Sequence, residues 1–326
     1  TDTGAELEVH DCILISFPVS KKKEKNEYGR RGYVLQSPEL LKARVAVSIE
    51  ESSIATASMS SPRPTQSKTA REIRDIIDAL EFDDVASYFE QDDDEIDPYV
   101  VCDGVSVGAF NRYIGDGEGL RFALRFLQLS DDGRILIVDL STTVHESTVQ
   151  CFEFEFLTAT GNGRLVKIGG STTVSRVGLP KKEADDTYGP LRSTPNRTRP
   201  PRPRIIADWV TLAVEVGRAQ TWASLETAAQ WWCGYAGIQY ILLLKVSRPG
   251  TQITYRLYEI NIPQCLPPPS ATGIIRRRNR PRPADSVTFN MRRILSIPAN
   301  QPLPNGLNPN AVVDLRIVME QVIDTI

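Results

Sequence analysis

The chain has 326 residues, of which 41% are hydrophobic and 24% charged, and its formal net charge is −3. This is an ordinary globular composition, sufficient for one large domain or two small ones. The net charge favours neither the presence nor the absence of a nucleic-acid partner.

Residue usage excludes several kinds of site. The two histidines, His10 and His145, are far apart, which excludes a His-rich metal site, so any metal must be held mainly by carboxylates. The five cysteines form no CxxC pair, which excludes a zinc ribbon, and their pattern fits a reducing compartment. No run of about eighteen apolar residues occurs, so we expect no contact with a membrane through a spanning segment.

The first part of the chain is predicted to be a partly flexible N-terminal extension, residues 1–69. Residues 18–27 and 50–69 are polar and weakly patterned, whereas residues 43–49 predict a short strand. The N-terminus lacks a secretory apolar region, and the sequence begins at Thr1, which leaves open a targeting signal upstream of it. We expect an intracellular protein.

From residue 70 onward the pattern predicts a folded α/β core that extends to residue 262. Apolar residues at helical spacing over residues 70–80 predict a helix with Ser67 or Thr69 as its cap. The acidic run at residues 90–97 lacks the glycine and the terminal glutamate of a calcium loop, which favours a solvated loop. A second helix is predicted after Gly117.

Three strands are predicted next, at residues 134–140, 148–158 and 164–168. In the second, phenylalanines alternate with glutamates, and this period of two is typical of a half-buried strand. The Thr-Gly-Asn-Gly sequence at residues 160–163 predicts a hairpin turn between the last two strands.

The later part of the core reads as strand, helix, strand, strand. Residues 209–216 are an apolar strand, and a helix at residues 224–232 follows with Ser224 as its N-cap. Strands are predicted at residues 238–246 and 251–262. This order favours a crossover connection within a mixed α/β sheet.

Two groups of carboxylates are candidates for chemistry. Glu215 is a lone charge in an apolar strand, which is costly to bury unless it is paired, protonated or bound to a metal; the alternative is that it marks the exposed end of the strand. Asp185 and Asp186 lie upstream, just before a loop. Two carboxylates from neighbouring strands can hold Mg²⁺ or Mn²⁺, whose bound water can attack a phosphodiester.

Three segments in this order resemble a known family. They are KKEADDTYGP at residues 181–190, AVEVGRAQTWASLETAAQWW at residues 213–232, and IQYILLLKVS at residues 238–247. Together they resemble a fungal and oomycete branch of the PD-(D/E)XK nuclease superfamily. The resemblance implies a restriction-endonuclease-like core, in which a central mixed sheet is flanked by helices, with N-terminal and C-terminal extensions. It also implies that Asp185 or Asp186 is the first acid of the motif and Glu215 the second.

The sequence departs from that motif at the lysine two residues after the second acid, where Gly217 stands. In the superfamily this lysine stabilises the attacking water or the phosphate. Gln220 is included among the catalytic candidates as a replacement, beside Asp185 and Glu215. Three basic residues also stay open as alternatives, namely Arg218, Lys167 and Lys182.

Two arginine-rich tracts are candidates for contacts with nucleic acid, DNA or RNA. Arginines in flexible Pro-rich loops can pair with phosphates, although solvated loops and, for residues 276–283, a nuclear localisation signal are alternatives. The first tract connects the two strands that carry the acids, which favours a nucleic-acid partner. The second lies in the C-terminal extension, residues 263–326, which ends in a predicted helix. The candidate contacts are Arg197, Arg199, Arg202 and Arg204 in the first tract and Arg276, Arg277 and Arg278 in the second.

The sequence thus predicts a Mg²⁺- or Mn²⁺-dependent nuclease-like protein that acts on or binds nucleic acid. The alternative is a catalytically inactive interaction module with the same fold and a protein partner, because the motif's lysine is missing. The two tryptophans Trp231 and Trp232 are predicted to pack in the core rather than to stack on bases.

Overall fold

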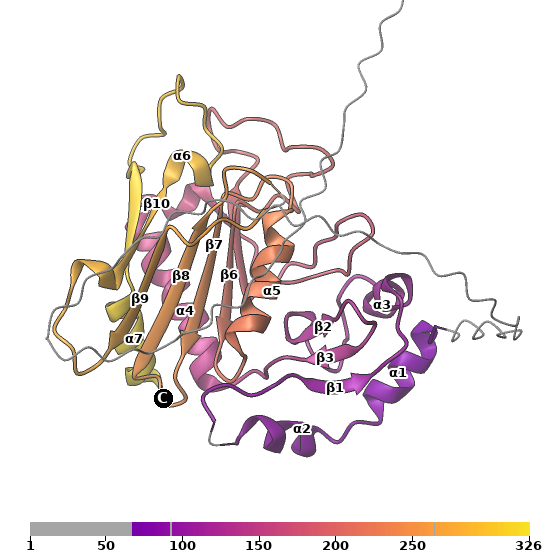
Figure 1. Cartoon of the computed structure of the whole chain (residues 1–326). Helices are drawn as coiled ribbons and strands as arrows, with labels where there is room; N and C mark the ends of the chain where they lie inside the picture. The colour runs from indigo at the N-terminus through magenta and orange to yellow at the C-terminus, as the bar shows by residue number, and fades with distance from the viewer. Residues whose placement is uncertain (1–66, 92, 264) are drawn as a thin grey trace, which may run out of the picture. The chain divides into compact units, whose positions relative to one another are not determined.

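The centre of the molecule is a six-stranded mixed sheet in a computed structural model that describes residues 67–91, 93–263 and 265–326 (Figure 1). The strand order is β4-β5-β6-β7-β8-β9, and the β6–β7 pair is parallel while the other pairs are antiparallel. The strands are β4 (Val166–Ile168), β5 (Asp186–Pro190), β6 (Leu212–Gly217), β7 (Tyr240–Val246), β8 (Gln252–Glu259) and β9 (Ala271–Arg276).

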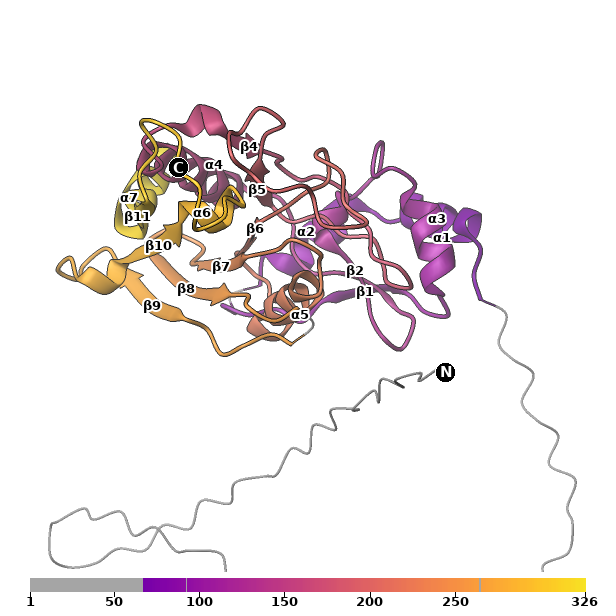
Figure 2. The same ribbon diagram turned by 90° about the horizontal axis from the view of Figure 1, so that it is seen from above.

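Helices cover both faces of this sheet (Figure 2). Helix α5 (Trp222–Cys233) connects the parallel strands β6 and β7 and covers one face, while α4 (Thr143–Ala159) and α7 (Leu315–Thr325) cover the other. Strands β6 and β7 are apolar throughout except for Glu215 and Lys245, as expected for central strands covered on both sides. The predicted mixed α/β class, with a central mixed sheet flanked by helices, is therefore confirmed.

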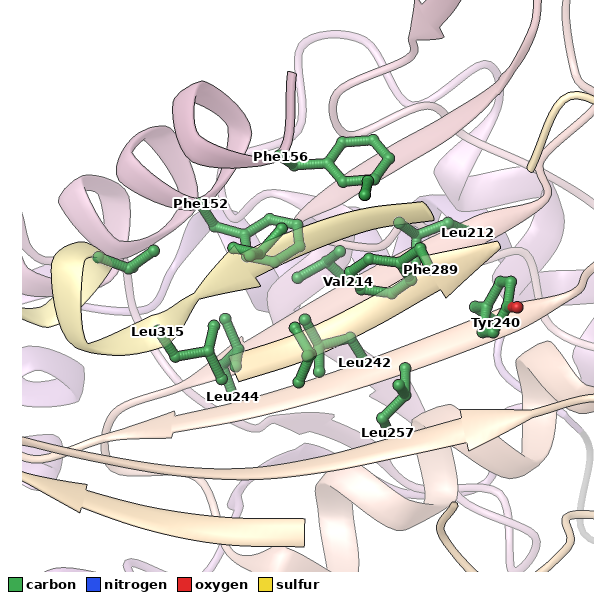
Figure 3. Packing of buried hydrophobic residues seen from close by; sticks show 14 of the residues in the cluster. Phe152, Phe156, Leu212, Val214, Tyr240, Leu242, Leu244, Leu257, Phe289 and Leu315 are labelled. Atoms are coloured by element: carbon green, nitrogen blue, oxygen red, sulfur yellow. The ribbon is translucent and has the colours of Figure 1, made fainter. Parts of the chain in front are cut away.

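The alternation of side chains along β6 assigns its residues to two different cores. Val214 packs with Phe152 and Phe156 of α4 and with Phe289, as Figure 3 shows. Ala213, the next residue along the strand, packs instead with α5 residues on the opposite face. Because successive side chains of a strand point to opposite faces, Glu215 lies on the α5 side.

A second, smaller sheet has the order β1-β3-β2 and a hydrophobic core of its own. Thr69 caps the first helix with a capping box, in which it exchanges hydrogen bonds with Glu72, as the sequence predicts. The elements of this part are α1 (Ala70–Asp78), α2 (Phe82–Phe89), β1 (Tyr99–Cys102), α3 (Val107–Ile114), β2 (Leu127–Leu129) and β3 (Ile135–Ile137).

The strand predicted at residues 148–158 is wrong, because these residues lie in α4, and no hairpin follows. Phe152 and Phe156 are fully buried, whereas Phe154 is 63% exposed. Residues four apart lie on the same face of a helix. Phenylalanines at alternate positions are therefore also compatible with a helix that buries the first and the third and exposes the second. Thr142 caps its N-terminus by accepting from the His145 amide.

Two other helix predictions need correction. The helix expected after Gly117 lies before it, as α3; Gly117 itself has a φ of 95°, a left-handed conformation that a helix cannot continue through. Helix α5 begins two residues earlier than predicted, and Thr221 is its cap by accepting from the Ser224 amide.

Residues 263–326 are continuous with the core. They add β9 to the central sheet, and the β10–β11 pair packs on the α4 side with α7, the helix predicted near the end of the chain. The predictions for residues 1–66, including the strand at residues 43–49, lie outside the described residues. No helix of the described chain is long and apolar enough to cross a membrane. The remaining elements are β10 (Ser286–Asn290), α6 (Met291–Ile294) and β11 (Asn310–Asp314).

Candidate functional site

The structure places Asp185 and Glu215 at the same end of two adjacent strands. Asp186, the first residue of β5, pairs with Val214 in the antiparallel β5–β6 register, so the start of β5 lies beside the end of β6. The Val216 amide donates to Asp185 Oδ2 over 2.6 Å, which ties the first acid to the residue after the second. Both acids are buried.

Asp186 does not join this pair, although it is a candidate metal ligand in the sequence. It is the first residue of β5 and lies two residues before Tyr188, so both side chains point to the face of the sheet that packs against α4. There it accepts hydrogen bonds from the Thr187 amide and from the Tyr188 hydroxyl. Burial raises the pKa of Asp186 to about 7. Of the two aspartates, Asp185 is the one beside Glu215.

Glu215 is fixed through one carboxylate oxygen. The indole of Trp232 donates to Oε1 over 2.6 Å, and the Lys182 ammonium lies 3.4 Å from the same atom. Burial raises the pKa of Glu215 to about 7, although the Lys182 charge and the Trp232 hydrogen bond oppose that rise. Trp232 is fully buried, as predicted, but it is also the donor that orients the acid.

The ammonium group of Lys182 does reach the site. It comes from the connection between β4 and β5 and not from position 217, where the motif has its lysine. A Cβ atom at Gly217 would lie 3.2 Å from both Gln220 Cβ and Leu225 Cδ1, so a side chain there meets close neighbours. Lys182, one of the alternatives left open by the sequence, instead brings its ammonium to Glu215.

The other proposed replacements are engaged elsewhere. Lys167 donates to the carbonyl oxygens of residues 206 and 207, and Arg218 pairs with Glu90 over 2.6 Å. The Gln220 side-chain amide donates to Ser224 Oγ over 2.8 Å. Gln220 therefore lies in the turn after β6, and no contact joins it to Asp185 or Glu215 within the described residues.

His145, which the sequence analysis did not single out, lies against Asp185. Its Nε2 is 3.2 Å from Asp185 Oδ1, and its Nδ1 is 3.3 Å from Glu146. Burial alone lowers the pKa of His145, but its interactions with the nearby carboxylates of Asp185 and Glu146 outweigh burial and raise it to about 10. Arg125 adds a second positive charge, 3.6 Å from Asp185 Oδ1. Only the fold brings these residues from α4 and from the segment before β2 to the sheet, so no local pattern identifies them.

The turn between β6 and α5 is held by a buried carboxylate. Asp139 Oδ2 accepts from the amides of Arg218, Ala219 and Gln220 at 2.7, 3.1 and 3.4 Å. The described acidic residues between 90 and 97 are exposed, as predicted, whereas Ile96 is buried and its amide donates to the Ala219 carbonyl in this turn.

The first arginine tract lies at the opposite end of the strands from the acids. Residues 191–211 join the end of β5 to the start of β6, where Tyr188 pairs with Leu212. The loop does connect the two strands that carry the acids, as predicted, but it lies away from the acids, because the connecting loop of an antiparallel pair lies at the end opposite the outer termini.

Two arginines of that tract hold the loop in place, Arg197 by contacts within it and Arg204 also by contacts with Ser175 and Tyr235 outside it. Arg197 donates to three carbonyl groups within residues 191–198, and Arg204 donates to Asp208 and lies over the Tyr235 ring. Arg199 and Arg202 are exposed.

The second tract lies at the end of the sheet where β6 ends. Arg276 pairs with Gln252 across β8–β9, and the Arg277 amide donates to Thr251 in the β7–β8 turn. Arg277 and Arg278 are exposed. Of the two tracts, the second therefore shares its end of the sheet with the acids, three strands away from β6.

The donor set at this site is compatible with Mg²⁺. Within the described residues, no group of three His, Cys, Asp or Glu side chains is arranged to hold a metal ion. Mg²⁺ needs only one or two carboxylates, because waters and phosphate complete its coordination. Asp185 and Glu215 supply such oxygens, and Asp185 Oδ1 is buried without accepting a hydrogen bond. The same oxygen lies near His145 and Arg125, so a metal competes there with two cationic side chains.

Comparisons with known proteins give a distant likeness to a solved structure. No family model matches the chain, and no curated protein matches it. Among solved structures, it is similar to a DUF820 protein from Anabaena variabilis whose assignment as a nuclease is provisional. The two share 12% sequence identity with a TM-score of 0.38, over 67% of this chain and 99% of that one. A likeness at this TM-score does not determine an activity.

Proposed function

We propose that the chain is a Mg²⁺- or Mn²⁺-dependent nuclease-like protein in which Asp185 and Glu215 hold the metal. The observation that carries the proposal is the contact of Lys182 with Glu215, 3.4 Å between Nζ and Oε1, beside the buried Asp185. Two acids and a lysine are the functional groups of the PD-(D/E)XK motif that the sequence resembles. Here the lysine comes from a different position in the chain.

The protein's own groups are oriented before any ligand arrives. The Val216 amide fixes Asp185, and the Trp232 indole fixes Glu215. Lys182 brings a positive charge next to the acids, where it can stabilise negative charge on a phosphate oxygen. A bound Mg²⁺ supplies a water of lowered pKa and neutralises further charge.

Cleavage assays on matched variants test this proposal. The full chain is incubated with Mg²⁺ or Mn²⁺ and with single-stranded and duplex DNA and RNA. Asp185→Asn and Glu215→Gln are each expected to reduce the cleavage rate about a hundredfold or more. Asp186→Asn is the matched control, because Asp186 is the adjacent buried acid on the other face. Cleavage that both site variants leave unchanged would rule the assignment out.

A second candidate function is a catalytically inactive interaction module. It is favoured by the burial of both acids, at 8% and 4% exposure, and by the donors and cations that already surround them. Such a protein binds no Mn²⁺ in calorimetry yet binds a nucleic-acid or protein partner. Tight Mn²⁺ binding that Glu215→Gln abolishes would count against it and in favour of the nuclease.

A further inference from the structure

A pocket of about 480 Å³ lies next to the candidate site, between β2, α5 and residues 176–182. Lys182 lines this pocket, and its ammonium also contacts Glu215. One side chain therefore borders both the pocket and the acids. The volume lies within the range of roughly 300–1,000 Å³ that is typical of sites for single small ligands.

The pocket carries excess positive charge. Arg176, Lys181 and Lys182 line it, and Asp131 is the one acid in the lining. Arg176 donates to the Trp231 carbonyl and Lys181 to the Gly115 carbonyl. These partners are uncharged, and neither cation forms an ion pair with a described carboxylate. The positive charges of Arg176 and Lys181 are thus fixed in place but not neutralised, which favours an anionic ligand.

The rest of the lining is largely apolar and is held rigidly. Leu127, Leu179, Pro180 and Trp231 contribute to it. The Trp231 indole donates to the Pro180 carbonyl over 2.9 Å, which joins α5 to the cationic segment. A ligand that fits both parts has an anionic group at the Lys182 end and a flat apolar group beside the apolar wall.

We infer that this pocket binds one unpaired nucleotide, with its phosphate toward Lys182 and its base against the wall formed by Leu127, Leu179 and Trp231. A base-paired nucleotide is excluded, because its partner strand does not fit a pocket for one small ligand. The preferred substrate of the adjacent acids is then single-stranded nucleic acid or a free end. The preference for single-stranded substrate rests on the proposed function, whereas the binding of a nucleotide in the pocket does not.

Calorimetry on the full chain without divalent metal tests the binding directly. The probes are adenosine 5′-monophosphate, adenosine, inorganic phosphate and a blunt DNA duplex. The monophosphate is expected to bind more tightly than adenosine or phosphate alone, because it engages both parts of the pocket. Lys181→Gln and Arg176→Gln are each expected to weaken it about tenfold, through loss of a charge-assisted contact. Arg277→Gln, which removes an exposed arginine outside the pocket, is the matched control and is expected to bind normally.

A third variant fills the pocket without removing a charge. Thr227 is exposed on α5 and lines the pocket, so Thr227→Trp is expected to block the monophosphate while the melting temperature stays close to that of the unmodified chain. Unchanged affinity in Thr227→Trp, or no binding of the monophosphate to the unmodified chain, overturns the inference. Duplex binding that is tighter than binding of the monophosphate and sensitive to Lys181→Gln overturns it as well.

The two proposals fail in different ways. If Asp185→Asn abolishes cleavage while the pocket variants bind the monophosphate normally, the nuclease stands and the pocket assignment fails. If the monophosphate binds as expected and no cleavage is found, the pocket stands and the nuclease fails.

Discussion

At one end of the β5–β6 pair, Asp185, Glu215 and Lys182 lie together, and both acids are almost fully buried. At the other end, residues 191–211 form a long loop with exposed arginines. The loop lies between Asp185 and Glu215 in the sequence, and on that basis it is expected to adjoin both acids. In space it is separated from them by the length of the strands, about 3.3 Å for each residue. Position along the chain therefore assigns the arginines to the wrong end of the sheet.

Each end has a turn or loop held by a single charged side chain, but the two side chains differ in burial. Asp139 is 1% exposed and accepts three backbone amides after β6, whereas the half-buried Arg197 donates to three carbonyl groups after β5. We expect Asp139→Ala to reduce the free energy of unfolding by about 3–5 kcal/mol, because it leaves buried amides without acceptors.

Arg197→Ala is expected to reduce the free energy of unfolding by only about 1 kcal/mol, because water can reach the carbonyl groups it leaves. Urea denaturation measures both changes. Equal losses of unfolding free energy in the two variants would mean that the two ends of the strands are equally rigid. The distinction between a preorganised site at one end and a supporting loop at the other would then be wrong.

The two ends also differ in how their contribution to stability depends on pH. Burial raises the pKa of Glu215 from its ordinary value of 4.5 to about 7. The stability that the protonated carboxyl contributes is fully present below the ordinary pKa and is lost as the pH rises through about 7. Glu215→Gln removes this titration, so the variant should gain stability relative to the unmodified chain between about pH 5 and pH 8, by up to about 3 kcal/mol.

Denaturation at several pH values checks this expectation, with Arg197→Ala as the reference at the other end. A guanidinium stays charged across this range, so the difference between that variant and the unmodified chain should be independent of pH. A flat profile for Glu215→Gln would show that the acid is ionised in the folded protein throughout, as expected if the Lys182 charge outweighs burial.

The sequence predicts the central elements of this fold because their patterns are strong. Strands β6 and β7 are apolar runs of strand length on either side of a capped helix, and few other structures accommodate that order. Helix α4 is missed because Phe152 and Phe156 satisfy both a period of two and a spacing of four. Only the sheet beneath α4, which buries those two rings and leaves Phe154 exposed, decides between the two structures.

The candidate site could be predicted in part. The resemblance implies that Asp185 or Asp186 and Glu215 come from neighbouring strands, but which of the two adjacent aspartates faces Glu215 depends on the register of β5. The sequence identifies Lys182 as one of several candidate replacements but gives no reason to choose it. Whether its ammonium contacts Glu215 depends on the path of the chain before β5. His145 carries no local signal, since its approach to Asp185 is set by the packing of α4 against the sheet.

Lys182 at one end of the strands and the exposed loop arginines at the other should differ in their effect on cleavage. Lys182→Met removes the ammonium beside Glu215 and is expected to slow cleavage about a hundredfold, or about 2.7 kcal/mol, by leaving developing negative charge without its partner. Arg202→Gln removes an exposed guanidinium at the far end and is expected to change the rate less than about twofold. Single-turnover rates with saturating single-stranded substrate separate this effect from binding. If Arg202→Gln slows cleavage as much as Lys182→Met does, nucleic acid reaches both ends of the sheet, and the loop after β5 belongs to the substrate path after all.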